Sequence, residues 1–159
     1  MCSPITEKFF SHKEIVSMLK GIPKILSPEL IYTLAKMGHG DEIVISDGNF
    51  PGHSVGKDNI VLRSDGTGVP ELLEAILQLI PLDTYADCVY LMDKTESDKD
   101  LDIPIWEEYK KIIAPHTSQQ PQFLERQAFY DRAKKAYAVV VTGEGAIYAN
   151  ILLKKGVVK

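Results

Sequence analysis

The sequence predicts a layered α/β/α single domain built around a central, mainly parallel but mixed sheet. Three observations carry this prediction: helical and strand-like segments alternate along the chain, the strand-like segments are short runs of apolar residues, and turn sequences separate them. Strands of parallel sheets are covered by helices on both faces and are therefore almost continuously hydrophobic. With 159 residues, the chain has the length of about one domain.

The first helix is expected over residues 28–37. Ser27 followed by Pro28 is typical of a helix start, because serine caps free N–H groups and proline has no N–H to leave unbonded in the first turn. An apolar stripe continues to the end of this segment. Gly38 is expected to end the helix in the left-handed conformation.

A strand is expected next, over residues 41–47 (DEIVISD). His39 lies just before it, and Asp47 lies at its end, before the turn sequence GNFPG. Ligands of open α/β sheets bind outside the carboxyl ends of strands, which makes Asp47 a candidate binding residue. The same residue fits a second interpretation equally well, in which its carboxylate only bonds the backbone of its own turn.

The remaining elements follow from prolines and apolar runs. Pro81 halts one helical segment, and Pro104 and Pro115 bound another. The expected helices run from near Pro70 to residue 80 and over residues 104–113 and 122–136. The expected strands cover residues 86–92, 137–142 and 146–154. The last two strands are separated by GEG, which suits a turn and an antiparallel pair. The charged stretch DKTESDKDLD at 93–102, between the strand at 86–92 and the helix at 104–113, is interpreted as a solvated loop.

Five polar or aromatic residues are candidates for chemistry, each with a plainer alternative. Histidine can both give and take a proton near neutral pH, so His39 is the first candidate, although it also suits bonding to the last carbonyls of the preceding helix. Asp83 fits a capping loop residue as well, and Tyr130 a core residue. Tyr148 and Asn150 are two apart in an expected strand and so share one side, which fits either a binding wall or a solvent-facing edge.

Composition excludes several classes of protein. A net charge of −4 without a basic block argues against nucleic acid binding. The longest apolar stretch, at 136–141, is far shorter than the roughly 20 residues that cross a bilayer. Cys2 and Cys88 show no metal-like spacing, so no metal site is expected, and with no signal-peptide pattern the chain is expected to be cytoplasmic. Residues 1–17 are interpreted as an extension of a domain at 18–159.

Four ordered blocks of the sequence resemble one family. The stretch LKGIPKILSPELIYTLAKMGHGDEIVISDGNFPG, together with GVPELLEAILQLIPLDTY, FYDRAKKAYAVVVTGE and YANILLKKGV, is similar to the RbsD/FucU sugar mutarotase and pyranase family. The likeness covers nearly everything from Leu19 to Val158. It implies an RbsD-like fold, interconversion of the α and β anomers of L-fucose without redox cofactor or metal, and a homo-oligomer with active sites near subunit contacts.

The resemblance also implies roles for single residues. The family's proton-donating histidine falls on His39 and its active-site tyrosine on Tyr130, which would be the catalytic pair. The implied sugar-binding residues are Asp47, Asp83, Tyr148 and Asn150. This sequence departs from the family in its first 17 residues and in the loop 93–102, where the family varies.

Two other functions remain open on the sequence. One is a ribose-type pyranase that uses the same residues to interconvert pyranose and furanose forms. The other is a non-catalytic sugar-binding protein of the same fold. The ribose-type members of the family resemble this chain less around the turn DGNFP, so through Asn49 and Phe50 the resemblance favours fucose.

Overall fold

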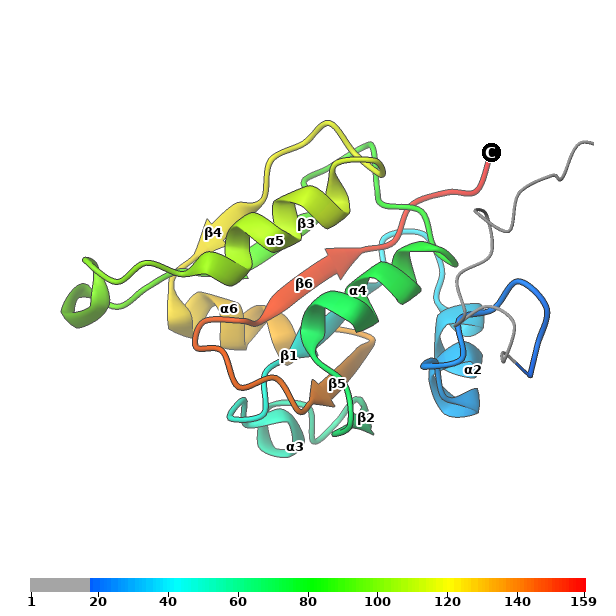
Figure 1. The fold of residues 1–159 in the computed structure, drawn as a ribbon, viewed down its shortest axis with the longest axis horizontal. Helices are drawn as coiled ribbons and strands as arrows, with labels where there is room; N and C mark the ends of the chain where they lie inside the picture. The colour runs from blue at the N-terminus through cyan, green and yellow to red at the C-terminus, as the bar shows by residue number, and fades with distance from the viewer. Residues whose placement is uncertain (1–17) are drawn as a thin grey trace, which may run out of the picture.

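The structure, a computed structural model, describes residues 18–159, so the expected extension at residues 1–17 lies outside the described residues. In the described part of the chain, six strands form one sheet in the order β2-β5-β1-β6-β3-β4 (Figure 1). The strands are β1 Glu42–Ser46, β2 Ile60–Ser64, β3 Val89–Met92, β4 Gln122–Leu124, β5 Ala138–Thr142 and β6 Ile151–Lys154. Only β6 runs antiparallel to its neighbours, β1 and β3. The expected mixed, mainly parallel sheet is confirmed.

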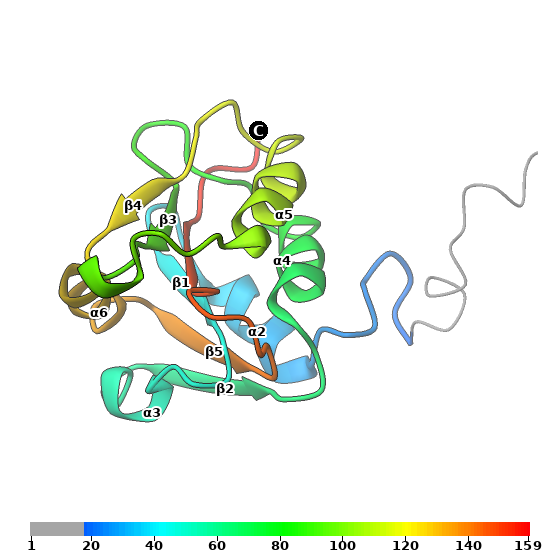
Figure 2. The ribbon, with the colours of Figure 1, turned by 60° about the vertical axis from the view of Figure 1, so that its left-hand side comes forward.

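Helices cover both faces of this sheet, as the two views together show (Figure 2). One face carries α2 (Pro28–Lys36), α4 (Val69–Leu77) and α5 (Pro104–Ile113), and the other carries α3 (Gly52–Val55) and α6 (Arg126–Ala133). The central strand β1 is apolar on both sides because Ile43 and Ile45 enter the first core while Val44 enters the second. The α/β/α architecture is therefore confirmed. None of the helices among residues 18–159 is long and apolar enough to cross a membrane.

Helix α2 begins as predicted but ends differently. The N–H of Leu30 donates to Ser27 Oγ at 3.1 Å, which is the expected cap. The helix ends because Met37 turns to an extended conformation, with φ −66° and ψ 134°. The expected left-handed residue was assigned wrongly to Gly38, since it is Gly40 that has φ +85°. His39 therefore lies inside a turn rather than directly on a helix end.

The helix expected over residues 122–136 is wrong in its first third. Gln122–Leu124 form the edge strand β4, which pairs in parallel with β3. The exposed edge of β3 offers backbone groups that need partners, and this outweighs the helix-like pattern of the sequence. Glu125 then starts α6 by accepting hydrogen bonds from the N–H groups of Gln127 and Ala128. Phe123 consequently stacks on Trp106, at 4.8 Å between ring centroids, instead of extending a helix face.

The expected antiparallel pair at the end of the chain is also wrong. Strands β5 and β6 are not paired, because β1 lies between them and pairs with both. Strand β6 begins only at Ile151, and Tyr148 before it has φ +54°, so the two-residue alternation expected for Tyr148 and Asn150 does not apply. The edge strand β2 was not predicted. Its side chains are mostly half-exposed, which gave a weaker apolar signal than the buried strands.

Candidate active site

The predicted site residues lie at two opposite ends of β1. His39 precedes the strand and Asp47 follows it, and the five residues of β1 alone span about 16 Å. Because β6 is antiparallel to β1, the residues before β6 lie near Asp47, whereas those after it lie near His39. Figure 1 shows this separation, with the light-blue loop before β1 near the β6 arrowhead and the orange loop before β6 at the other end.

The first end, which we call the histidine end, consists of His39, Asp83 and Tyr85. His39 Nε2 lies 3.0 Å from Asp83 Oδ1, and the Tyr85 N–H donates to the same oxygen at 3.2 Å. The ring of Tyr85 lies 5.4 Å from that of His39. Asp83 is buried, with 4% of its side chain exposed, whereas the His39 side chain is 47% exposed. A buried carboxylate thus holds an imidazole that faces solvent, and the expected bond from His39 to the end of α2 is not observed.

Backbone hydrogen bonds attach both loops of the histidine end to the chain around the end of β6. The N–H of Gly40 donates to the carbonyl of Lys155 at 2.9 Å, and the N–H of Asp83 donates to the carbonyl of Lys154 at 3.0 Å. Gly156 lies against Leu82, where a Cβ would meet the backbone at 2.4 Å. His39 and Asp83, which are 44 residues apart in sequence, are thereby brought together by one strand.

The charge of Asp83 determines which ring nitrogen of His39 carries the proton. Burial disfavours the charged carboxylate, but hydrogen bonds from Tyr85 N–H and His39 outweigh burial, so the pKa of Asp83 lies below its ordinary value. An ionised carboxylate only accepts hydrogen bonds, so His39 Nε2 carries the proton in this contact. The other nitrogen, Nδ1, has no hydrogen-bond partner in the described part of the chain and is free to exchange a proton with a ligand.

The second end, which we call the aspartate end, consists of Asp47, Tyr148, Asn150 and Tyr130. The N–H of Asp47 donates to Asn150 Oδ1 at 2.9 Å, which leaves the amide nitrogen of Asn150 to donate elsewhere. The carboxylate of Asp47 accepts from the N–H of Asn49 at 2.9 Å, so Asp47 does bond the backbone of its own turn, a contact that leaves its binding role open. Burial nevertheless raises the pKa of Asp47, because it outweighs the backbone hydrogen bonds to the carboxylate, including the one from Asn49, which lower that pKa.

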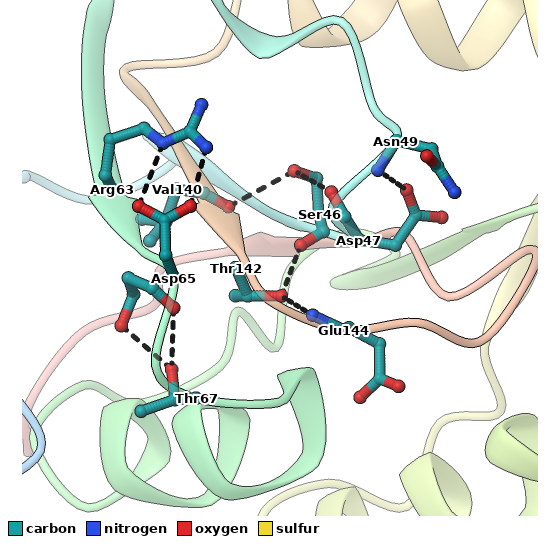
Figure 3. Close-up of polar contacts among 10 residues, drawn as sticks. Ser46, Asp47, Asn49, Arg63, Asp65, Thr67, Val140, Thr142 and Glu144 are labelled. Atoms are coloured by element: carbon teal, nitrogen blue, oxygen red, sulfur yellow. Dashed lines mark hydrogen bonds and ion pairs between the residues drawn. The ribbon is translucent and has the colours of Figure 1, made fainter.

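A network of polar groups restrains the backbone next to Asp47, at the end of β1 (Figure 3). Thr142 Oγ1 donates to the carbonyl of Ser46 at 2.7 Å and accepts from the N–H of Glu144 at 3.1 Å. The carboxylate of Glu144 in turn accepts from the N–H of Val69 at 3.1 Å, at the start of α4. The network joins the ends of β1 and β5 to a helix, and therefore limits the movement of Asp47.

Tyr148 is held in an unusual backbone conformation. Its φ of +54° is costly for a residue with a side chain, on the order of 1–3 kcal/mol. Its carbonyl accepts from Trp106 Nε1 at 2.8 Å, and the next carbonyl, of Ala149, accepts from the Tyr109 hydroxyl at 2.6 Å. Trp106 is therefore a structural residue that maintains this turn. Sequence reasoning missed this role of Trp106 and Tyr109, because nothing in the sequence relates them to residues about 40 positions away.

Tyr130 and Phe50 belong to the second core, on the α6 face. The rings of Phe50 and Tyr130 meet edge to face at 5.5 Å between centroids. Phe50 is buried, with 6% of the residue exposed, so it supports Tyr130 from within the core. Tyr130 is half-buried, and its hydroxyl has no hydrogen-bond partner among the described residues. Tyr130 thus combines a ring that packs in the second core with a hydroxyl that is available to a ligand.

A surface cavity of about 660 Å³ lies beside the loop that carries His39, but it contains none of the six predicted site residues. Its lining includes Gly40, Glu42 and Arg132. Arg132 donates two hydrogen bonds to the carboxylate of Glu42, at 2.6 and 3.0 Å, and lies over the ring of Tyr90. Arg132 and Glu42 thus form an ion pair in the wall of this cavity.

The fold and these strand-end groups define a small α/β/α protein with titratable and hydrogen-bonding side chains at both ends of its central strand. The sequence model of the RbsD / FucU transport protein family matches residues 20–158, and the chain belongs to that family. The fucose mutarotase of Danio rerio is 53% identical to it over 145 residues, which are 89% of this chain and 95% of the relative.

Two solved structures share the fold. FucU from Bifidobacterium longum superimposes with a TM-score of 0.85 at 51% identity, covering 88% of this chain and 100% of the other. The fucose mutarotase of Streptococcus pneumoniae, solved in complex with L-fucose, has a TM-score of 0.83 at 48% identity and covers 89% of this chain and 100% of its own. The resemblance that the four sequence blocks predicted is therefore confirmed.

Proposed function

We propose that this protein is a fucose mutarotase, an isomerase that interconverts the α and β anomers of L-fucopyranose by opening and reclosing the sugar ring. The observation that carries the proposal is the likeness, over nearly the whole chain, to a fucose mutarotase that was solved with L-fucose bound. The substrate is a small neutral sugar, in keeping with the chain's lack of a basic surface for nucleic acid. The buried, unpaired thiol of Cys88 suits a reducing compartment, so we assign the activity to the cytoplasm.

The reaction needs two coordinated proton transfers. The anomeric hydroxyl loses a proton as the bond between C1 and the ring oxygen breaks, and the ring oxygen gains one, which leaves an open-chain aldehyde. Rotation about C1–C2 followed by the reverse steps closes the ring on the other face. Positioned acid and base groups accelerate such steps by roughly 10²–10⁴-fold. No covalent intermediate with the protein is required.

We assign the proton transfers to His39 and Tyr130. The free Nδ1 of His39 takes or gives a proton while Asp83, at 3.0 Å from Nε2, stabilises the imidazolium that forms. Tyr130 serves the second oxygen, because its hydroxyl is not engaged by other described residues. We assign sugar hydroxyl binding to Asp47, as acceptor, and to the amide nitrogen of Asn150, as donor.

These roles require two copies of the chain at each site. Within one chain the length of β1 separates His39 from Asp47, and a hexose is only about half as long as that strand. We therefore propose a homo-oligomer in which the histidine end of one subunit meets the aspartate end of the next. Contact between two different surfaces is the head-to-tail type that closes into rings.

Saturation-transfer NMR tests the proposed activity directly. The wild-type protein is expected to accelerate exchange between the two anomeric protons of unlabelled L-fucose above the rate in buffer. D-Ribose serves as the matched control sugar. Faster exchange of ribose than of fucose would identify a ribose-type pyranase, and fucose binding without faster exchange would identify a non-catalytic sugar-binding protein.

Mixing two inactive variants tests the shared site. His39→Ala lacks a working histidine end, and Asn150→Ala lacks a working aspartate end. When equal amounts of the two variants are unfolded and refolded together, about one quarter of the subunit contacts should join an intact histidine end to an intact aspartate end. Activity should be restored in proportion. A mixture of Asn150→Ala with Asp47→Ala, two variants that are both damaged at the aspartate end, should stay inactive. Equal inactivity of both mixtures would contradict a site shared between subunits.

A further inference from the structure

The loop 93–102 is attached to Tyr148 rather than merely solvated. The hydroxyl of Tyr148 donates to Asp98 Oδ2 at 2.6 Å and accepts from the N–H of Thr95 at 3.2 Å. Asp98 is half-exposed and lies on the short 3-10 helix Glu96–Asp98, at the tip of the loop that extends from the body of the fold in Figure 1. The simple solvation that the charge pattern predicted is therefore wrong for this carboxylate.

The same loop is held closed by its own contacts. Lys94 Nζ donates to the carbonyls of Lys99 and Leu101, at 2.9 and 2.7 Å, and so joins the two arms of the loop. At its base, the N–H of Asp93 donates to the carbonyl of Leu124 in β4 at 2.7 Å. These contacts hold the loop in one conformation, so its hydrogen bonds to Tyr148 cost little further conformational entropy.

Tyr148 is fixed at both of its ends by these contacts. Its backbone is held at φ +54° by the bond from Trp106, and its hydroxyl is held by Asp98 and Thr95, 50 or more residues away in the chain. The hydroxyl proton is used by Asp98, and the hydroxyl oxygen lies 3.2 Å from both the backbone nitrogen and the side-chain oxygen of Thr95, so what Tyr148 can offer a ligand is its ring. The position of the Tyr148 ring then depends on the loop.

We infer that Asp98 is a positioning residue, which holds Tyr148 in the place where it contacts the sugar. This inference rests on the proposed function and on the sugar-binding role that the family resemblance implies for Tyr148. Asp98 acts through Tyr148 and touches no reacting atom. A residue that improves contact with both the bound sugar and the transition state changes KM, and leaves kcat nearly constant.

The test combines fucose binding with exchange kinetics. Asp98→Ala is expected to raise both the Kd of L-fucose, measured by calorimetry, and the KM by roughly tenfold, with kcat within about twofold of wild type, as loss of one charge-assisted hydrogen bond predicts. Asp98→Asn keeps an acceptor oxygen and should recover most of the affinity. Lys94→Met should weaken binding in the same direction by opening the loop. Asp100→Asn, an exposed carboxylate of the same loop, is the matched control and should match wild type.

A double variant separates positioning from a general effect on the fold. In the background of Tyr148→Phe, adding Asp98→Ala should not change the Kd further, because the contact through the hydroxyl is already lost. An unchanged Kd in Asp98→Ala, or equal losses in both backgrounds, would overturn the inference while leaving the mutarotase activity intact. If the wild type binds fucose without accelerating exchange, the proposed activity fails but the Kd series still decides the role of Asp98. If the wild type neither binds fucose nor accelerates its exchange, both proposals fall.

Discussion

Replacing Asp83 by asparagine removes one charge from the histidine end with almost no change in shape. The amide oxygen of the Asp83→Asn variant still accepts from the N–H of Tyr85 and from His39 Nε2, so the geometry is preserved. What is lost is the charge that stabilises the imidazolium. Charge-assisted hydrogen bonds are about twice as strong as neutral ones, and the half-exposure of His39 reduces this difference. We therefore expect the variant to lose about 1 kcal/mol of transition-state stabilisation. This corresponds to a roughly five- to tenfold slower exchange.

Anomer-exchange NMR at pH 7, with urea unfolding of the same samples, measures both consequences. Because hydrogen bonds lower the pKa of Asp83 in the folded state, its carboxylate stabilises the fold above the ordinary aspartate pKa, and this contribution disappears as pH falls through the lowered value. The difference in unfolding free energy between wild type and variant should therefore shrink below about pH 4. Asp87→Asn, exposed in the same loop, is the control. Unchanged exchange in Asp83→Asn would refute a role for this carboxylate in catalysis.

Two further predictions concern the aspartate end. Burial raises the pKa of Asp47 in the folded state, so the protein loses stability as pH rises through this raised pKa and the buried carboxyl group ionises. Asp47→Asn should therefore increase the unfolding free energy at pH 7 while lowering the rate of fucose exchange. A variant that is both less stable at pH 7 and fully active would contradict this. Tyr109→Phe leaves the buried carbonyl of Ala149 without its donor at 2.6 Å and should lower the unfolding free energy by about 1–2 kcal/mol, a fall in Tm of a few degrees. Thermal unfolding measures the second effect, and an unchanged Tm would show that the bond contributes nothing.

Local signals in the sequence predicted much of the fold. Ser27 and the prolines at positions 28, 70 and 104 mark helix starts that the structure confirms. The apolar runs of β1 and β5 predicted buried strands, because a strand covered on both faces has no polar side. The order of the strands was not readable in the same way. Residues 122–124 look helical on their own and become a strand only because the edge of β3 is free to pair with them.

The residues of the candidate site were predictable one at a time, from their types and from the family pattern, but their grouping was not. Asp83 joins His39 across 44 residues and Asp98 joins Tyr148 across 50, through contacts that leave no periodic trace in the chain. In DKTESDKDLD nothing distinguishes Asp98 from its acidic neighbours, although Glu96 pairs with Lys99 and Asp93 accepts from the N–H of Lys94 instead.

The sequence by itself determined the layered α/β/α class, the main helix boundaries and the identity of the polar groups around β1, because caps, prolines and apolar runs act between near neighbours. Only the tertiary structure decided that β1 separates His39 from Asp47, that β6 runs against its neighbours, and that a charged loop holds Tyr148. These outcomes depend on which backbone edges and buried groups remain to be satisfied once the chain is folded, and no short stretch of sequence contains that information.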